Sequence, residues 1–177
     1  AALLMALLLA VLRTLVGEHL DASELMRRLN LQICRHSPGS RFITLFYAEY
    51  SPVTGRLVYV NAGQTPPLIR RRDGSYQRLE ATGIALGMFE GSTYVASETR
   101  LDPGDMLVAY SDGITEAESP TGQPFEEAGL EGVLATYAAF SAAELGTETI
   151  RAVERHAQDS RFSDDLTILV MKRQALA

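Results

Sequence analysis

Two apolar segments in the C-terminal half of the chain each adjoin a loop that carries an aspartate. Met106–Tyr110 leads into Asp112, and residues 166–171 follow Asp164. Apolar runs of this length are typical of buried strands. A carboxylate at the end of such a strand is costly to bury unless it is paired or bound to a metal. Together the two aspartates predict an oxygen-ligand site for Mg²⁺ or Mn²⁺.

The composition is that of an ordinary globular protein, and its 177 residues predict a single domain. Sixteen basic and 22 acidic residues give a net charge of −6. This charge argues against a nucleic-acid surface, because phosphate binding needs a basic face. Cys34 is the only cysteine, so no internal disulfide forms, which fits a reducing, cytoplasmic location. We expect Cys34 to be a small buried side chain.

The apolar N-terminus fits neither a signal peptide nor a membrane span. No positive charge precedes the run, as a signal peptide requires. A span needs about 20 apolar residues, and Arg13 and Glu18 come too early for that. We therefore expect residues 1–16 to form a well-covered helix. Because the chain opens within a helical pattern and without an initiator methionine, we interpret it as part of a longer protein.

The rest of the pattern predicts hairpins between two pairs of helices. Asp21 and Glu24 form the spacing of a capping box for a second helix that ends at Pro38 and Gly39. Strands are expected over residues 42–50, 56–61, 68–72, 76–79, 93–101, 106–110 and 166–172. Two further helices are expected over about residues 126–139 and 141–157, the second with a capping box of Ser141 and Glu144. Hairpins make antiparallel sheets, so the expected class is α+β, with sheets covered by helix pairs.

Several polar residues also have a purely structural interpretation. Taken alone, Asp112 is a turn residue before a glycine, and Asp164 is a helix cap or a solvated loop residue. The adjacent arginines at positions 70–72 either meet phosphate or keep a strand edge solvated. Glu116 and Glu118 flank the expected site and could hold a water there. The occurrence of both aspartates beside apolar strands shifts the balance toward a shared site.

Five segments carry a resemblance to a known family, and they occur in the family's order. They are AALLMALL at residues 1–8, NAG and PPL at residues 61–68, LDPGDMLVAYSDG at residues 101–113, YSDGITEA at residues 110–117, and DDLT at residues 164–167. The chain resembles the bacterial SpoIIE-like branch of the PPM-type, Mg/Mn-dependent serine/threonine phosphatases. The resemblance implies an antiparallel β-sandwich flanked by helix pairs, formed by one phosphatase-like domain over residues 1–177.

The resemblance also implies a chemistry and a set of site residues. In this family two Mg²⁺ or Mn²⁺ ions activate a water that attacks a phosphoserine or phosphothreonine, without a protein nucleophile. Asp112 and Asp164 would both ligate one ion. Asp165 and Glu116 would act through the ligands rather than on the ion, and Gly113 would let the backbone pass close to the site.

Two departures from the family's pattern affect what this chain does by itself. The family's other metal motif, an Asp-Gly segment before the first helix, and the first strands would lie upstream of Ala1. We therefore expect the chain alone to be a weak or inactive enzyme. Gln64 stands where the family often has His after Asn-Ala-Gly, so no polar role is assigned there.

The expected partners follow from the same resemblance. They are a phosphorylated protein substrate such as an anti-sigma factor antagonist and an N-terminal sensor or receiver domain, with a homodimer as a further arrangement. The first alternative is a non-catalytic regulatory or scaffold domain of the same fold. The second is another two-metal phosphodiesterase or nuclease, against which the net charge of −6 and the lack of clustered histidines argue.

Overall fold

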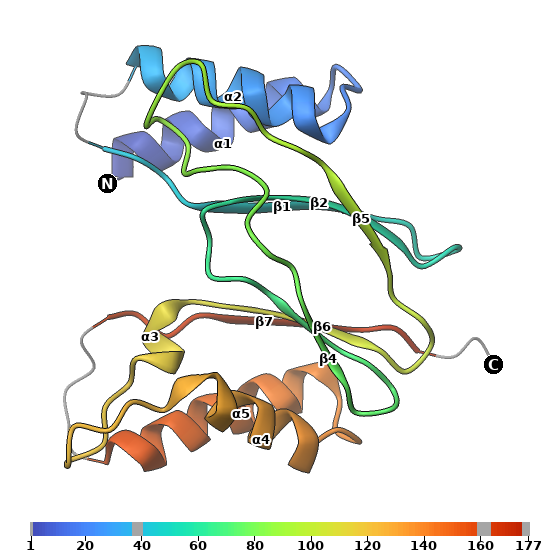
Figure 1. Ribbon diagram of the computed structural model, residues 1–177, viewed down its shortest axis with the longest axis vertical. Coiled ribbons are helices and arrows are strands. Elements are labelled where there is room, and N and C mark those ends of the chain that lie inside the picture. Colours follow the sequence, from blue (N-terminus) through green and yellow to red (C-terminus); the bar gives the residue numbers. More distant parts are fainter. Residues whose placement is uncertain (1, 37–40, 159–163, 175–177) are drawn as a thin grey trace. The chain divides into compact units, whose positions relative to one another are not determined.

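The computed structural model describes residues 2–36, 41–158 and 164–174, which form two compact units (Figure 1). Unit 1 comprises Ala1–Pro66 and Glu80–Arg100, and unit 2 comprises Pro67–Leu79 and Leu101–Ala177. Each unit contains one antiparallel sheet with a helix pair of its own. The α+β prediction with antiparallel sheets and helix pairs is therefore confirmed.

Unit 1 contains a three-stranded sheet in the order β1-β2-β5. Its elements are α1 (Ala2–Val16), α2 (Ala22–His36), β1 (Leu45–Tyr50), β2 (Arg56–Ala62) and β5 (Ser97–Arg100). The β1–β2 hairpin runs from the pair Leu45↔Ala62 to the pair Tyr50↔Leu57. Helix α2 is amphipathic, and its buried face includes Leu25, Met26, Leu29 and Ile33, which pack with Val60 and Ala62 of β2.

Helix α1 differs from the prediction of a well-covered helix. One face, formed by Leu4, Leu8, Val11 and Leu15 with their neighbours, contributes to the core of unit 1. The other face leaves Leu3, Met5, Leu9 and Val16 exposed, with exposed fractions of 89, 51, 47 and 47%. The prediction failed because one helix partner covers only one side of a helix that is apolar all round. No helix among the described residues is both long and apolar enough to cross a membrane.

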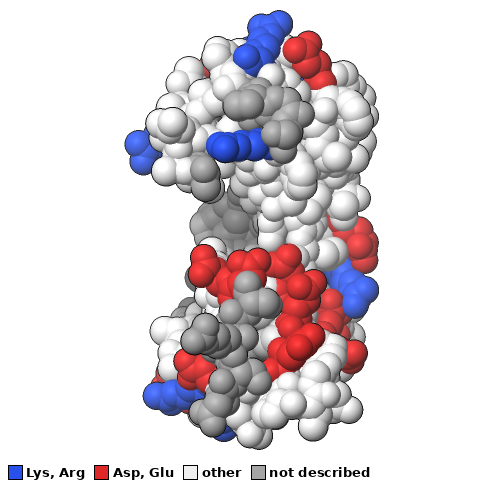
Figure 2. Space-filling model, turned by 90° about the vertical axis from the view of Figure 1, so that its left-hand side faces the viewer, with Lys and Arg blue, Asp and Glu red and all other residues white. Residues whose placement is uncertain are grey.

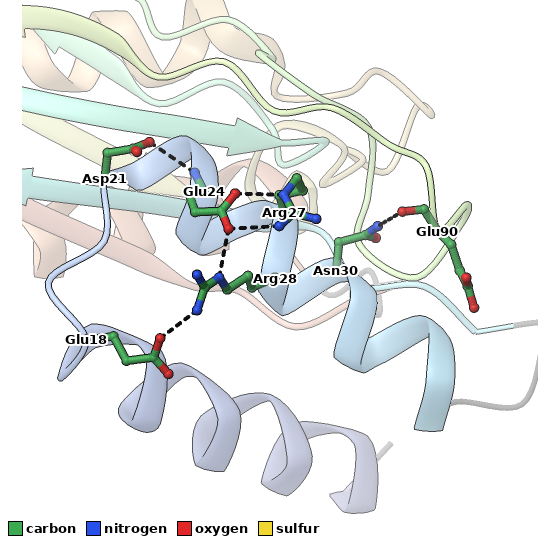
Figure 3. Close-up of polar contacts among 7 residues, drawn as sticks. All are labelled: Glu18, Asp21, Glu24, Arg27, Arg28, Asn30 and Glu90. Carbon is green, nitrogen blue, oxygen red and sulfur yellow. Dashed lines mark hydrogen bonds and ion pairs between the residues drawn. The ribbon is translucent and has the colours of Figure 1, made fainter.

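Polar contacts fix the start of α2 (Figure 3). The Glu24 amide donates to Asp21 Oδ1 at 3.0 Å, which confirms Asp21 as the predicted cap. The Glu24 carboxylate accepts hydrogen bonds from Arg27 and Arg28, each at 2.7 Å. In the predicted capping box this carboxylate would instead pair with the Asp21 amide. Hydrogen bonds from Arg27 and then Arg28 lower the pKa of Glu24 to about 2. The predicted end at Pro38 and Gly39 lies outside the described residues.

A buried asparagine attaches the loop before β5 to α2. Asn30 is fully buried, and its side-chain amide donates to the Phe89 carbonyl at 2.9 Å and lies within 3.5 Å of the Glu90 carbonyl (Figure 3). Its Oδ1 accepts the Gly87 amide at 2.8 Å. The loop backbone is thus paired to a helix far away in sequence, as buried polar groups require.

Unit 2 contains a four-stranded sheet in the order β4-β3-β6-β7. Its elements are β3 (Leu68–Arg70), β4 (Tyr76–Arg78), β6 (Met106–Tyr110), α3 (Asp112–Thr115), α4 (Glu126–Thr136), α5 (Ala142–Ala157) and β7 (Ile168–Lys172). Apolar residues of α4 and α5, including Leu130, Leu134, Leu145 and Val153, pack with Val108 and its neighbours in the sheet. The capping box of Ser141 and Glu144 is confirmed, because each side chain pairs with the other residue's amide.

The unit also contains a buried ion pair that the sequence did not reveal. Asp105 is 2% exposed, and its carboxylate accepts from Arg71 Nη1 at 2.7 Å and from the Arg72 and Asp102 amides at 2.9 Å each. Although burial acts to raise the pKa of Asp105, these hydrogen bonds and the Arg71 charge lower it below its usual value. At least one arginine of the 70–72 run therefore stabilises the turn before β6.

Candidate metal centre

Asp112 stands where the chain leaves the sheet of unit 2. Its preceding residue, Ser111, extends the ladder between β6 and β7: the Ser111 amide donates to the Thr167 carbonyl, and the Thr167 amide donates to Ser111 Oγ, both at 3.0 Å. The chain then turns into α3, a four-residue helix whose first residue is Asp112. The Asp112 Oδ1 atom accepts the Gly113 amide at 3.0 Å, which orients the carboxylate at the helix start.

Asp164 occupies the matching place before β7. Its Oδ1 atom accepts the amide of Asp165 at 2.7 Å. The Asp165 carbonyl in turn accepts a hydrogen bond from Ser111 Oγ at 2.8 Å, so this loop is attached directly to the segment that leads into Asp112. The structure thus brings together two segments that are about fifty residues apart in sequence.

Gly113 allows this approach. A Cβ atom at Gly113 would lie 2.6 Å from the Asp165 carbonyl oxygen and 3.5 Å from the Asp164 carbonyl carbon. The first distance is shorter than a carbon–oxygen contact tolerates, and backbone atoms cannot move aside as a flexible side chain can. The position therefore requires glycine because of close packing, in line with its predicted role of letting the backbone pass near the site.

The predicted burial of the two carboxylates is wrong. Asp112 and Asp164 are exposed, as are Asp165, Glu116 and Glu118. The residues lie beyond Tyr110↔Ile168, the last pair of the ladder, where the sheet no longer covers them. Strand β7 is only half-buried, because it is at the edge of the sheet, and Leu169 is 58% exposed. The cost of burying a carboxylate therefore gives no reason to expect a metal here. The approach of the Asp112 and Asp164 segments is the remaining reason.

The exposed carboxylates give this end of unit 2 a strongly negative surface. Figure 2 shows acidic side chains gathered on unit 2, in the lower half of the picture. Hard carboxylate oxygens suit Mg²⁺ or Mn²⁺, so Asp112 and Asp164 fit such an ion by their chemistry. Among the described residues, however, no group of three or more His, Cys, Asp or Glu side chains is placed to hold an ion. The described residues therefore do not by themselves form a complete ligand set for such an ion.

Glu116 and the histidines have other roles in the described structure. The Glu116 amide donates to the Asp112 carbonyl at 2.8 Å and ends α3, so its backbone supports the turn that carries Asp112. His19 and His36 belong to unit 1 and are exposed. His156, in unit 2, lies against the Gln123 carbonyl at 2.9 Å and the ring of Phe125. No histidine takes part in the centre formed by the described segments.

Comparison with known proteins places the chain in a family. The sequence model described as "Stage II sporulation protein E (SpoIIE)" matches residues 1–174. The chain is 34% identical over 142 residues to Protein IcfG of Synechocystis sp., a match that covers 78% of this chain and 22% of that protein. It is 29% identical over 175 residues to Phosphoserine phosphatase RsbU of Bacillus subtilis, covering 98% of this chain and 52% of RsbU. The chain thus spans about half of RsbU and a smaller part of IcfG.

Solved structures share the fold. The RsbU and RsbW domains of Rv1364c from Mycobacterium tuberculosis match with a TM-score of 0.80 and 28% identity, over 100% of this chain and 49% of that one. The SiaA-PP2C domain of Pseudomonas aeruginosa matches with a TM-score of 0.80 and 18% identity, over 97% and 68%. The catalytic domain of the phosphatase PstP, solved in complex with two manganese ions, matches with a TM-score of 0.68 and 16% identity, over 96% and 80%. By the match over residues 1–174 and the shared fold, the chain belongs to the SpoIIE family of PPM-type phosphatases.

Proposed function

We propose that residues 1–177 form a single phosphatase domain that hydrolyses phosphoserine or phosphothreonine on a bacterial signalling protein, such as an anti-sigma factor antagonist. One observation carries the proposal: the Asp112 and Asp164 segments converge at one end of the β6–β7 ladder. Membership of the SpoIIE family supports it, as does the likeness to RsbU, which is named a phosphoserine phosphatase.

Asp112 and Asp164 are the residues that would hold the divalent ion, Mn²⁺ or Mg²⁺, with two ions in the intact centre. When bound, such ions lower the pKa of a coordinated water and neutralise phosphoryl oxygens. The contribution of the chain is to hold the two carboxylates in place. Each aspartate accepts the amide of the residue that follows it, at 3.0 and 2.7 Å, and Ser111 bonds both segments together. Because the two side chains are already held in place, they lose little conformational entropy when they bind an ion.

Neighbouring residues would act on the two aspartates rather than on the substrate. Asp165 fixes the loop through its carbonyl and adds negative charge beside Asp164. Glu116 ends the short helix that begins at Asp112. Gly113 keeps the two segments close. We propose no role for these three residues in bond breaking.

The proposal extends to the setting of the domain. We propose that an N-terminal sensor or receiver domain regulates it, that it acts in the cytoplasm, and that a homodimer is its working form. The alternative is a non-catalytic regulatory or scaffold domain of the same fold. The finding that favours this alternative is that, among the described residues, no group of three or more His, Cys, Asp or Glu side chains is placed to hold an ion.

An assay of phosphate release distinguishes a phosphatase from a non-catalytic regulatory or scaffold domain. The assay uses the full-length protein, a phosphoserine protein and a small aryl phosphate, with Mn²⁺, with Mg²⁺ or with a chelator. We expect metal-dependent release, and we expect Asp112→Asn and Asp164→Asn each to lower the rate by about 100-fold or more, because a neutral amide cannot balance the cation's charge. Asp73→Asn, in an exposed turn of the same unit, is the matched control. Equal rates for the wild type and both site variants would favour the scaffold domain.

A further inference from the structure

A second candidate site lies at the opposite end of the unit 2 sheet. A pocket of about 650 Å³ is bordered by the turn at Pro103 and Gly104, the α4–α5 connection and the C-terminal end of β7. Lys172 on its wall pairs with Met106, the first residue of β6, whereas Asp112 comes two residues after Tyr110, the last residue of that strand. At roughly 3.4 Å per residue, the two ends of β6 are about 14 Å apart. The pocket is therefore separate from the candidate metal centre.

The charged side chains that line this pocket are all cations. They are Arg72, Lys172 and Arg173, and the described residues on its wall include no aspartate or glutamate. Three like charges that face one cavity repel each other unless an anion compensates them. This arrangement stands out in a chain whose net charge is −6.

Hydrogen bonds hold two of the three cations in place. Lys172 Nζ donates to the carbonyls of Ala138 and Phe140 at 2.7 and 2.6 Å, which uses two of the three donors of an ammonium group. Arg173 Nη1 donates to the Leu101 carbonyl at 2.5 Å, so this guanidinium group is held at the wall of the pocket. Side chains that are already ordered lose little conformational entropy when a ligand binds.

Arg72 is positioned by its backbone and by its aliphatic stem. Its amide donates to Asp105 Oδ1 at 2.9 Å. Its stem lies over Gly104, where an added Cβ atom would be 3.1 Å from Arg72 Cδ and where φ is +99°. The Arg72 side chain is exposed, and no described residue pairs with its guanidinium group. Of the three cations, Arg72 is therefore the one whose charge a bound anion would stabilise most.

We propose that this pocket binds a phosphate group, either free or as the ester of a small organic molecule. A guanidinium fork matches two phosphate oxygens, and an ammonium group adds a point charge. The volume falls within the range of small-molecule sites and exceeds what a free phosphate fills, and the partly exposed ring of Phe140 offers an apolar surface for the remainder of an ester. The N-terminus of α5 is already capped by the box of Ser141 and Glu144, so we do not assign its amides to the phosphate.

The test is a calorimetric titration of the chain in chelator and at low ionic strength, so that it does not depend on the metal centre. The probes are inorganic phosphate and a nucleoside 5′-monophosphate. We expect saturable binding with a dissociation constant of about 1 mM or below, and a loss of affinity of about tenfold in Arg72→Gln, because one charge-assisted pair is removed. Arg151→Gln, an exposed arginine of α5 outside the pocket, should bind like the wild type.

The variants also identify the form of the phosphate. Tighter binding of the monophosphate, reduced by Phe140→Leu, would assign an ester, and equal binding of both probes would assign free phosphate. Arg72→Gln changes an exposed side chain, so thermal unfolding should show that it folds like the wild type. The proposal is overturned by a lack of saturation below about 10 mM, by unchanged affinity in Arg72→Gln, or by binding of an acidic peptide but neither phosphate compound.

Discussion

Unit 1 and unit 2 share an architecture but differ in how their charges are distributed. Each has an antiparallel sheet and a helix pair, yet unit 1 carries seven basic and seven acidic residues, whereas unit 2 carries nine and fifteen. The whole net charge of −6 therefore belongs to unit 2. Within unit 2, exposed carboxylates gather at the Asp112 end of the β6–β7 ladder, and three cations line a pocket at the other. Both the candidate metal centre and the proposed phosphate pocket therefore belong to the unit that has the unequal charge.

The ion pairs of the two units also differ in environment. In unit 1, Arg56 pairs with Glu98 across neighbouring strands, and both side chains are more than half exposed. In unit 2, Arg71 pairs with Asp105, whose side chain is 3% exposed. Exposed pairs contribute about 0–1 kcal/mol, whereas loss of one partner from a buried pair costs about 3–5 kcal/mol. Substitutions at these pairs therefore test whether an ion pair stabilises the fold of unit 2 more than that of unit 1.

The largest expected effect on stability is at Asp105. We expect Asp105→Ala to lower the free energy of unfolding by about 3–5 kcal/mol, because it removes the buried carboxylate that accepts from Arg71 Nη1 and from the Arg72 and Asp102 amides. Glu98→Gln in unit 1 should lower it much less, because both side chains of that pair are exposed to solvent. Urea denaturation of both variants measures the difference. Similar losses would contradict the distinction between the two pairs.

The pH dependence of stability should follow the same residue. The pKa of Asp105 is lowered below the usual 3.8, so in the folded chain it stays charged to lower pH than in the unfolded chain. Its contribution is complete above about pH 3.8 and is lost as the pH falls through the folded pKa. We expect Asp105→Asn to flatten the acid limb of the stability curve, measured by thermal unfolding at several pH values. An unchanged acid limb would show that other carboxylates determine it.

The next largest effect is on the candidate metal centre of unit 2. In Gly113→Ala the new Cβ atom would lie 2.6 Å from the Asp165 carbonyl oxygen, so the Asp164 segment must move. We expect metal-dependent phosphate release by the full-length protein to fall by about 100-fold, since displacements near 1 Å have that effect on a catalytic site. Gly132→Ala on α4 is the matched control, because nothing lies within 4 Å of its added Cβ.

The control variant should be as active as the wild type and slightly more stable, by about 0.5–1 kcal/mol, since alanine favours a helix. Equal activity of Gly113→Ala and Gly132→Ala would mean that the approach of the two segments is not needed for catalysis. The metal affinity of each variant, measured by titration with Mn²⁺, distinguishes a displaced ligand from a general loss of folding.

A smaller effect is expected in unit 1, at Asn30. Asn30→Ala removes the acceptor of the Gly87 amide and one of the donors to the Phe89 carbonyl, which still accepts from Ser92. We expect a loss of about 1–3 kcal/mol in the free energy of unfolding. Hydrogen exchange should become faster at the Gly87 amide and unchanged in the β6–β7 ladder. Faster exchange in both units would show that they unfold together.

Short sequence patterns predicted much of the fold, because helix caps and hairpins are determined by residues that are close together in the sequence. The capping box of α5 depends on Ser141 and Glu144 alone, and the β1–β2 hairpin depends on a turn and two alternating strands. Short-range patterns did not predict α3, which forms where Ser111 pairs with Thr167, a residue far away in sequence. The pairing of Arg71 with Asp105 was missed for the same reason.

For the candidate site, the approach of the two segments agrees with the sequence, the exposure of their side chains does not, and the role of Asp112 and Asp164 as metal ligands stays a prediction. The two aspartates were found because each adjoins an apolar strand. Their exposure could not be read from those strands, since burial depends on which residues cover the sheet edge beyond Tyr110. The prediction that α1 is well covered failed for the same reason. An apolar composition does not show how many other elements pack against a helix.

The smallest expected effect is that of Leu3→Ser on the exposed face of α1, which is compared with Leu8→Ala on the buried face. Leu8→Ala should lower the free energy of unfolding by about 2–5 kcal/mol, because Leu8 is 4% exposed and packs in the core of unit 1. Leu3→Ser should change it by less than about 0.5 kcal/mol, because that side chain is 89% exposed. Urea denaturation of the two variants measures both values. A loss in Leu3→Ser as large as that in Leu8→Ala would mean that another surface covers this face in solution, and the original prediction of a covered helix would then hold for the protein in solution.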